Sequence, residues 1–517
     1  MYASHGFLRS DIGDVDVVYH DGIYHLFHLV LPNHDFIAHA VSRDGMTWRR
    51  VKNALFVDDP GAWDDDMLWT MHVTRDPDDD ASWRMFYTGL SRTEYGRVQR
   101  IGVARSKDLY NWTRCNSGKY PLEISPEWYE ANADEGRNWV SFRDPFFYHD
   151  RETGERLLLA AGRVKDGPIV RRGCVSLARE VETDRWEFGP PLYKPGLYDD
   201  VEVPNLFWLN GRYYLIGSIR EDVKIHYWTS DELTGPFRNF ADNVLLPKGN
   251  YAARICRAGD KLLLFNFFQR KEVIYGRETI ARMLPPPKEL VTDTRGRLML
   301  KSFSQFDKIV RNPFKVTNPA EIETLLGNPH ATISNEGGAL HVGCLSGYEA
   351  FLLPGEHQDF RLRAKMSMEG IGKCGLVFRM SDEADGYYLA LDLVKGYAQL
   401  RRWGANPRPE FEFAFQYESL QSGNFVPYPA SKDLNLEIVT HGMYIEFSIN
   451  GQVTLCVVDD AYDEGRVGFY TESAQLRLED VTMEWLSRPI TEEEPVYTAT
   501  RSHHDLPAHP LETPLGE

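Results

Sequence analysis

Residues 22–27, GIYHLF, are the first of five similar strands in the first 290 residues of this chain. The other four are residues 83–87 (WRMFY), 155–159 (ERLLL), 211–215 (GRYYL) and 260–265 (DKLLLF), at intervals of roughly 50 to 75 residues. Four of the five are followed by a second strand, a polar turn and an aromatic residue, as in Ser42-Arg43-Asp44 with Trp48. An irregular β-sandwich would not repeat this unit, whereas the blades of a propeller would. The repeat therefore predicts a five-bladed β-propeller.

The strand pattern of the sequence changes after residue 300. Residues 301–328 lack a strand pattern and are predicted to be a linker, and alternating strands resume between residues 339 and 470. Asn450-Gly451 is a hairpin-turn sequence between two of these strands, and antiparallel strands of this kind favour a β-sandwich. We therefore expect an all-β chain with a propeller (1–300), a linker (301–328), a sandwich (329–487) and a tail rich in Glu, Pro and Thr (488–517).

Charge and composition exclude several classes of partner. The formal net charge is −18 and no basic patch is visible, which argues against a nucleic-acid partner. No apolar run approaches the roughly 18 residues of a membrane span, so no membrane partner is expected. The N-terminus lacks a signal-peptide pattern, which predicts a cytoplasmic protein. The six cysteines are scattered without metal-ligand spacing, so we expect free thiols and no metal. The sequence is compatible with a homo-oligomer.

Three carboxylates, far apart in sequence, are the main clue to function. Asp14, Asp144 and Glu202 each lie at the start of a short apolar run or just before it. In a propeller, the innermost strand of each blade lines the central channel, so one residue from each blade can converge on the axis. Hydrolysis of a glycosidic bond requires two carboxyl groups in different protonation states. The pattern predicts a glycosidase.

Two further segments are candidates for substrate contact. Residues 62–70 hold three aspartates and two tryptophans, and Trp69 and Asp65 could supply stacking and hydroxyl acceptors. Most acidic runs of this kind are solvated loops, and that interpretation competes with substrate contact here. Tyr251 and Arg254 stand where the last blade is expected to begin, close to the axis; a structural turn would explain them equally well.

Four segments, in order, resemble the motifs of glycoside hydrolase family 32, which contains the invertases, levanases and inulinases. They are residues 37–48 (IAHAVSRDGMTW), 142–145 (FRDP), 202–207 (EVPNLF) and 287–298, and the resemblance covers roughly residues 8 to 305. It implies a five-bladed propeller followed by a concanavalin-like sandwich. It also implies cleavage of terminal fructofuranosyl residues from sucrose or short fructo-oligosaccharides by a retaining double displacement, without a cofactor.

The resemblance assigns a role to each carboxylate. Asp14 would be the nucleophile and Glu202 the general acid/base. Asp144 would stabilise the transition state by holding ring hydroxyls, with Arg143 beside it as a substrate-binding residue.

The first motif differs from the family pattern and leaves more than one activity open. Family 32 has Asn-Asp-Pro-Asn-Gly around its nucleophile, whereas residues 12–16 here are Ile-Gly-Asp-Val-Asp. The spacing of Asp14 from residues 22–24 resembles that in family 43, whose inverting enzymes act on arabinose- and xylose-containing oligosaccharides. A fructosyltransferase and a non-catalytic sugar-binding propeller are also compatible with the sequence.

Overall fold

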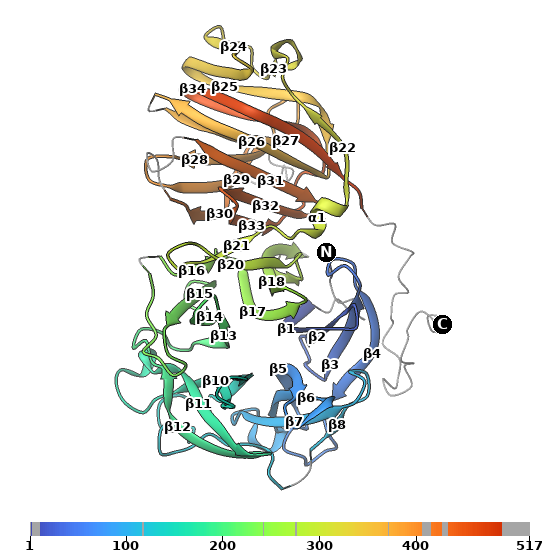
Figure 1. Cartoon of the computed structure of the whole chain (residues 1–517), viewed down its shortest axis with the longest axis vertical. Coiled ribbons are helices and arrows are strands. Elements are labelled where there is room, and N and C mark those ends of the chain that lie inside the picture. Colours follow the sequence, from blue (N-terminus) through green and yellow to red (C-terminus); the bar gives the residue numbers. More distant parts are fainter. Residues whose placement is uncertain are drawn as a thin grey trace. The chain divides into compact units, whose positions relative to one another are not determined.

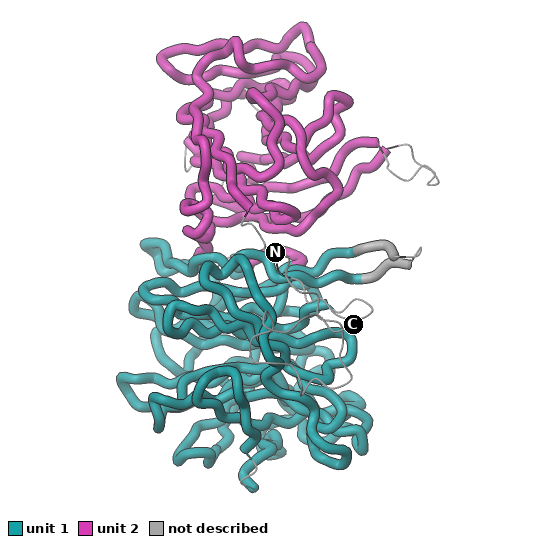
Figure 2. The backbone as a smooth tube through the Cα atoms, turned by 90° about the vertical axis from the view of Figure 1, so that its right-hand side faces the viewer, with its two compact units in different colours: residues 1–245, 250–298, 491–517 teal, residues 246–249, 299–490 magenta. Residues whose placement is uncertain are grey.

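The computed structural model describes residues 2, 11–115, 118–240, 242–274, 277–370, 372–405, 415–426 and 433–488. The chain divides into two compact units, residues 1–245 with 250–298 and residues 246–249 with 299–490 (Figure 2). The predicted tail, from residue 489 onward, lies outside the described residues. All six cysteines are free thiols, as expected. Among the described residues, no helix is both long and apolar enough to cross a membrane.

The first unit is a five-bladed β-propeller, which confirms the predicted fold (Figure 1). Each blade is an antiparallel sheet whose strands follow one another in sequence, except that β19 is a side branch of the fifth. The blades are β1 (Asp11–His20), β2 (Ile23–Leu31), β3 (Phe36–Ser42), β4 (Arg49–Phe56); β5 (Met67–Asp76), β6 (Asp79–Leu90), β7 (Arg100–Ser106), β8 (Thr113–Arg114); β9 (Arg143–His149), β10 (Arg156–Arg163), β11 (Gly173–Glu182), β12 (Arg185–Tyr193); β13 (Glu202–Leu209), β14 (Arg212–Ile219), β15 (Lys224–Ser230), β16 (Val244–Leu246); and β17 (Asn250–Ala258), β18 (Lys261–Ile274), β19 (Arg277–Met283), β20 (Lys288–Thr292), β21 (Leu298–Lys301).

In the polar turn of the sequence repeat, side chains accept hydrogen bonds from backbone amides of the same turn. In the first blade, Ser42 Oγ accepts a hydrogen bond from the Gly45 amide (2.9 Å), and Asp44 Oδ1 accepts from Thr47 N (2.7 Å). The second blade repeats this arrangement, with Ser106 Oγ accepting from Leu109 N (2.9 Å) and Asp108 Oδ1 from Asn111 N (2.7 Å). Because these bonds satisfy the turn's amides locally, the Ser-x-Asp sequence forms the same turn in both blades.

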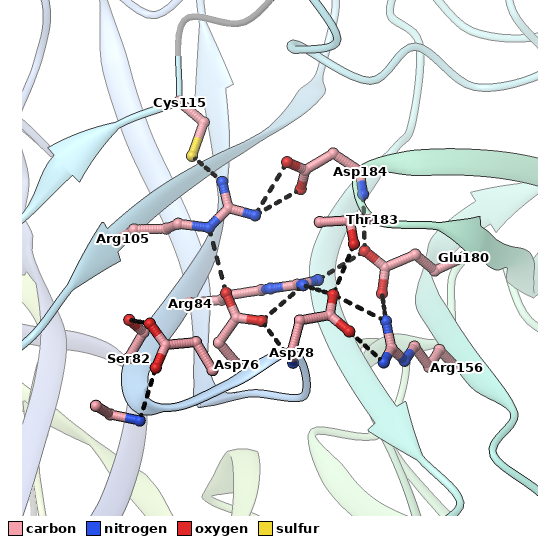
Figure 3. A network of polar contacts seen from close by, with 12 residues as sticks. Asp76, Asp78, Ser82, Arg84, Arg105, Cys115, Arg156, Glu180, Thr183 and Asp184 are labelled. Atoms are coloured by element: carbon pink, nitrogen blue, oxygen red, sulfur yellow. Dashed lines mark hydrogen bonds and ion pairs between the residues drawn. The ribbon is translucent and has the colours of Figure 1, made fainter.

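Blades two and three are joined by a network of buried ion pairs (Figure 3). Arg84 on β6, whose side chain has no exposed surface, donates to Asp76 (2.7 Å) and to Glu180 on β11 (2.7 Å). Arg156 on β10 donates to Asp78 (2.6 Å), which follows β5. Each guanidinium fork meets carboxylates of both blades, so the network fixes one blade against the next.

The first strands of the five blades, β1, β5, β9, β13 and β17, form the inner wall of the propeller. β1 lies beside both β5 and β17, and β9 lies beside β5 and β13, so the ring of inner strands closes. Their first residues therefore lie together at one end of the channel, although they are far apart in sequence.

The second unit is a β-sandwich built from one continuous, strongly bent set of strands, as predicted. Its central strand, β34 (Gly465–Leu486), pairs with β25 and β27 along its first half and with β26 and β22 along its second half. The other strands are β22 (Val310–Lys315), β23 (Glu323–Thr324), β24 (Ala331–Glu336), β25 (Ala339–His357), β26 (Phe360–Glu369), β27 (Lys373–Met380), β28 (Gly386–Asp392), β29 (Tyr397–Ala405), β30 (Phe415–Asn424), β31 (Leu434–His441), β32 (Tyr444–Ile449) and β33 (Gln452–Val458). Asn450 and Gly451 take up φ 51° and 74°, the left-handed pair of the expected hairpin turn.

Residues 301–328 differ from the predicted linker. They contain the short helix α1 (Gln305–Lys308) and the strands β22 and β23, which pair with β34 and β25 of the sandwich. These strands are short and carry few apolar residues, so their sequence lacks the alternation that marks a half-buried strand. Their pairing partners, rather than their own pattern, make them strands.

Candidate active site

Every inner strand of the propeller carries an irregularity near its first residues. The pairing register shifts between Ile12 and Val15 in β1, between Trp69 and Met71 in β5, and between Glu202 and Asn205 in β13. β9 and β17 shift in the same way, opposite residues 159–161 and between residues 251 and 254. A bulge leaves one residue unpaired and redirects its side chain. The five bulges lie at Asp14, Thr70, Asp144, Val203 and Ala252 or next to them.

Three of the bulge residues have left-handed backbone conformations. The φ angles are 61° at Asp144, 50° at Val203 and 52° at Ala252. Such conformations cost about 1–3 kcal/mol each for residues other than glycine and persist only where the surroundings impose them. Hydrogen bonds from neighbouring elements do so here: Asp144 Oδ2 accepts from Val203 N (3.0 Å), and Ser218 Oγ accepts from Ala252 N (2.9 Å). The strained residues are Asp144 itself and the residues that directly follow Glu202 and Tyr251.

The bulges surround a cavity of about 360 Å³ that brings together the three carboxylates predicted from the sequence. Asp14, Asp144 and Glu202 all line it. The other lining residues are Gly13, Leu29, Leu31, His34, Trp69, Thr70, Arg143, Val203, Arg220, Val223, Tyr251, Phe267, Gln269 and Arg282. The predicted contacts Arg143, Trp69 and Tyr251 thus belong to the same pocket.

Glu202 is held by two donors. Arg143 Nη2 donates to its Oε1 (2.5 Å), and the Tyr251 hydroxyl donates to its Oε2. Arg143 also lies against Asp200 (3.2 Å) and Asp144 (3.7 Å), so one guanidinium serves three carboxylates. These contacts fix the orientation of Glu202 before any substrate arrives.

Asp14 is a carboxyl group with strongly perturbed acidity. It is half-buried and accepts a hydrogen bond from the Thr70 hydroxyl. Burial, followed by repulsion from Asp144, raises the pKa of Asp14 to about 7. Burial also raises the pKa of Asp144, with a further contribution from Glu202, although Arg143 opposes the rise. Near neutral pH the Asp14–Asp144 pair therefore holds a proton that ordinary carboxylates would have lost.

Arg254 lies below this pocket rather than in its wall. Its guanidinium donates to the carbonyl oxygens of Pro204 (2.8 Å) and Pro145 (2.8 Å), both within bulges of neighbouring blades. It also lies close enough to Asp14, Asp16 and Asp144 to interact electrostatically, and burial lowers the pKa of its guanidinium. The structure thus makes Arg254 a tie between blades, and it is not among the residues that line the cavity.

Asp65 also lies outside the pocket. Its carboxylate accepts from the amides of Gly61 (2.8 Å) and Arg92 (2.9 Å), and these backbone hydrogen bonds lower its pKa. The acidic run is therefore a hydrogen-bonded loop, and Trp69 is its contribution to the pocket. The indole Nε1 of Trp69 is buried without a hydrogen-bond partner, which leaves a donor for a bound ligand.

Sequence reasoning missed several residues of the pocket. Thr70 directly follows Trp69, but a threonine in a strand gives no signal of its own. Phe267, Gln269 and Arg282 come from the β18–β19 hairpin, and Arg220 from the end of β14. No group of three His, Cys, Asp or Glu residues in the described part of the chain could hold a metal ion.

Comparisons with known proteins agree with this geometry. The family model of the glycosyl hydrolases family 32 N-terminal domain matches residues 14–252, beginning at Asp14. No curated protein matches the chain in sequence.

Solved structures share the fold of the whole chain. A sucrose-6-phosphate hydrolase from Lactobacillus gasseri is 15% identical, with a TM-score of 0.67 over 94% of this chain and 92% of the other. Fructan 1-exohydrolase IIa from Cichorium intybus is 14% identical, with a TM-score of 0.67 over 94% and 96%. A family 32 β-fructofuranosidase from Bombyx mori is 16% identical, with a TM-score of 0.61 over 92% and 91%. The bulged propeller with its three carboxylates, and the family model that matches it, lead to one conclusion: residues 14–252 of this chain are a glycosyl hydrolase family 32 N-terminal domain.

Proposed function

We propose that this protein is a β-fructofuranosidase-like glycosidase that releases terminal fructofuranosyl residues from sucrose or short fructo-oligosaccharides. The observation that carries the proposal is the convergence of Asp14, Asp144 and Glu202 in one cavity of a family 32 propeller. Similar structures include one of fructan 1-exohydrolase IIa in complex with 1-kestose and one of the β-fructofuranosidase in complex with sucrose. The cavity of about 360 Å³ suits a terminal sugar rather than the interior of a polymer.

In the first step of the proposed double displacement, Asp14 attacks the anomeric carbon of the fructosyl unit. The glycosidic bond breaks as Glu202 transfers its proton to the departing oxygen, and a covalent fructosyl-Asp14 ester forms. Asp144 has one oxygen bound to the Val203 amide and offers its other oxygen to ring hydroxyls.

In the second step, Glu202 takes a proton from water as the water oxygen attacks the same carbon. The bond to Asp14 breaks, which regenerates the Asp14 carboxylate and the protonated Glu202 and releases fructose. Arg143 and Tyr251 hold Glu202 in place for both transfers. This scheme needs Asp14 ionised, so the proton that the Asp14–Asp144 pair holds in the free protein must leave when substrate binds.

The test is sugar release from sucrose, short inulin- and levan-type oligomers and aryl arabinofuranosides. Fructose release by the wild type, lost in Asp14→Asn and in Glu202→Gln, is the expected result. Asp21→Asn makes the same chemical change at an aspartate whose side chain is 86% exposed, and it should retain activity. Arabinose release would overturn the proposal in favour of a family 43-type furanosidase. No sugar release from any of these substrates would overturn it in favour of a binding propeller.

The stereochemical course is a separate measurement. NMR of the first product formed should show the anomeric configuration of the substrate retained, because two displacements invert it twice. First-formed product of opposite configuration would replace the double displacement with a single attack by water. Fructose transfer to a second sugar instead of water would leave the first step intact and make the enzyme a fructosyltransferase.

A further inference from the structure

The sandwich unit contains a larger cavity, of about 1390 Å³, which the proposed function does not use. It lies on a sheet face formed mainly by β28, β29 and β34, and every residue lining it belongs to the second unit. We call it the aromatic hollow, after five rings in its lining: Tyr348, Tyr388, Trp403, Tyr417 and Tyr470.

The five rings form one continuous series. Tyr470 contacts Tyr348 with ring centroids 5.5 Å apart, and Tyr388 lies 6.0 Å from Tyr470. Trp403 follows at 5.3 Å from Tyr388, and Tyr417 at 5.3 Å from Trp403. The series therefore crosses the sheet from β34 through β28 and β29 to β30.

The floor rings Tyr388 and Tyr470 pack in a buried apolar cluster with Leu352 and Val377, and the outer rings lie at the open side of this cluster. Strand alternation sends Tyr387 and Leu389 of β28 into the core, and Tyr388 and Ala390 to the opposite side. Gly375 on β27 lets Tyr470 pack closely on the sheet: a Cβ there would lie 1.9 Å from the Leu389 carbonyl oxygen and 2.6 Å from Tyr470 Cε1.

The outer rings are unusually exposed for their size. Trp403 is 46% exposed and Tyr417 50% exposed, whereas Tyr388 and Tyr470 at the floor are each only 7% exposed. Contiguous apolar surface of this kind marks a site of interaction rather than a structural surface.

Hydrogen-bonding groups of both polarities accompany the rings. Arg401 donates to Gln399 Oε1 (2.8 Å) and lies over the Tyr417 ring at 5.2 Å, so its remaining donors are held in a fixed orientation. Glu472, paired with Lys373 (2.9 Å), and Asp392 supply carboxylates to the same hollow. Neighbouring donors and acceptors suit vicinal hydroxyl groups, each of which both donates and accepts.

We propose that the aromatic hollow is a carbohydrate-binding site that holds a fructan chain, separate from the catalytic cavity. The C–H faces of sugar rings stack on flat aromatic side chains, and their hydroxyls meet the carboxylates, amide and guanidinium around them. At about 1390 Å³ the hollow exceeds the roughly 300–1,000 Å³ of ordinary small-molecule pockets, so it has room for several sugar units. The choice of fructan rests on the proposed function; the choice of carbohydrate rests on the hollow itself.

The experiment measures binding without turnover. In the full-length Glu202→Gln protein, binding of inulin and of levan is followed by affinity electrophoresis and calorimetry, with xylan and starch as other polysaccharides. Trp403→Ala in this background should weaken binding of inulin or levan about tenfold or more, as expected for loss of a central aromatic contact. Trp485→Ala is the matched control, because Trp485 is also 46% exposed on the same unit but does not line the hollow.

Three outcomes would overturn the proposal. In the first, the Trp403 and Trp485 variants bind fructan equally well. In the second, the protein binds only xylan or starch. In the third, Trp403→Ala changes the oligomeric state and leaves sugar binding unchanged. Tyr417→Ala, on the edge strand β30, repeats the test if Trp403→Ala fails to fold. Fructose release by the wild type is measured separately. Loss of fructan binding at the hollow can therefore be distinguished from failure of the catalytic proposal.

Discussion

Replacing Asp14 with asparagine should stabilise the propeller while abolishing hydrolysis. The carboxyl is half-buried beside Asp144, and its desolvation together with that neighbour raises its pKa from 3.8 to about 7. An ionised Asp14 is therefore unfavourable in the folded protein. Asparagine keeps the shape of the side chain and an oxygen that can accept from the Thr70 hydroxyl, but it removes the charge.

The magnitude follows from the two pKa values. Because the folded-state pKa is raised, the folded protein holds its proton more tightly than the unfolded chain between pH 3.8 and about 7. Above that window Asp14 is ionised in both the folded and the unfolded protein. Its raised pKa then lowers the free energy of unfolding by the full amount, about 4 kcal/mol at 1.36 kcal/mol for each pKa unit. Asp144 shares the proton, so we expect a gain of about 2–4 kcal/mol for Asp14→Asn at pH 8 and roughly a third of it at pH 5.

Thermal and denaturant unfolding of wild type, Asp14→Asn and the exposed control Asp21→Asn at pH 8 and pH 5 measure these differences. Other groups that titrate in this range are common to all three proteins and cancel in the comparison. A gain of the same size at both pH values, or a loss at pH 8, would refute the reasoning about the buried charge. The same ionisation predicts that wild-type kcat/KM falls as the pH decreases below about 7, which a pH series on sucrose would check.

Three further predictions concern other contacts. Tyr251→Phe removes the hydroxyl that holds Glu202 in place and should lower kcat/KM by up to about tenfold, since an intramolecular hydrogen bond contributes about 0.5–1.5 kcal/mol, with little change in melting temperature. Arg84→Met removes the nearest cation from the buried carboxylates of Asp76 and Glu180 and should cost about 3–5 kcal/mol. Lys107→Met, which breaks an exposed pair with Asp79, should cost less than about 1 kcal/mol; equal losses of stability in denaturant unfolding would contradict this. Burial lowers the pKa of His25 to about 4 and of His28 to about 3, so the unfolded chain binds more protons below pH 6.5 and stability should fall as the pH decreases from about 6.5 toward 4. His28→Gln should reduce that loss in calorimetry, and an unchanged pH dependence would rule out this source.

The propeller was predictable because its repeat is local. The Ser-x-Asp turns of the first two blades close through bonds between residues two or three apart, so the same short sequence makes the same turn in both. The three carboxylates were predictable for a related reason, since each lies at or near the start of an inner strand and all inner strands of a propeller face one axis. Tyr251 followed from the same argument, and the structure brings it to Glu202.

The remainder of the site depends on contacts between blades. The bulges at Asp144 and Val203 arise from the register against the neighbouring strand and from hydrogen bonds across blades. Neither can be inferred from the sequence of one strand alone. The carbonyls of Pro145 and Pro204 in these bulges are bound by Arg254, and so a residue expected to touch substrate instead joins the blades. Asp65 likewise takes its role from backbone amides that only the folded loop presents.

The sequence by itself determined which elements form, because strand alternation and turn chemistry act over a few residues. It also named three acids that the structure brings together in one cavity. Only the tertiary structure decided the acidity of Asp14, since burial and the proximity of Asp144 depend on five strands meeting at one axis. The aromatic hollow was hidden for a similar reason: Tyr348 and Tyr470 come from strands distant from those of the other three rings, and alternation alone does not tell which face of a sheet meets the core.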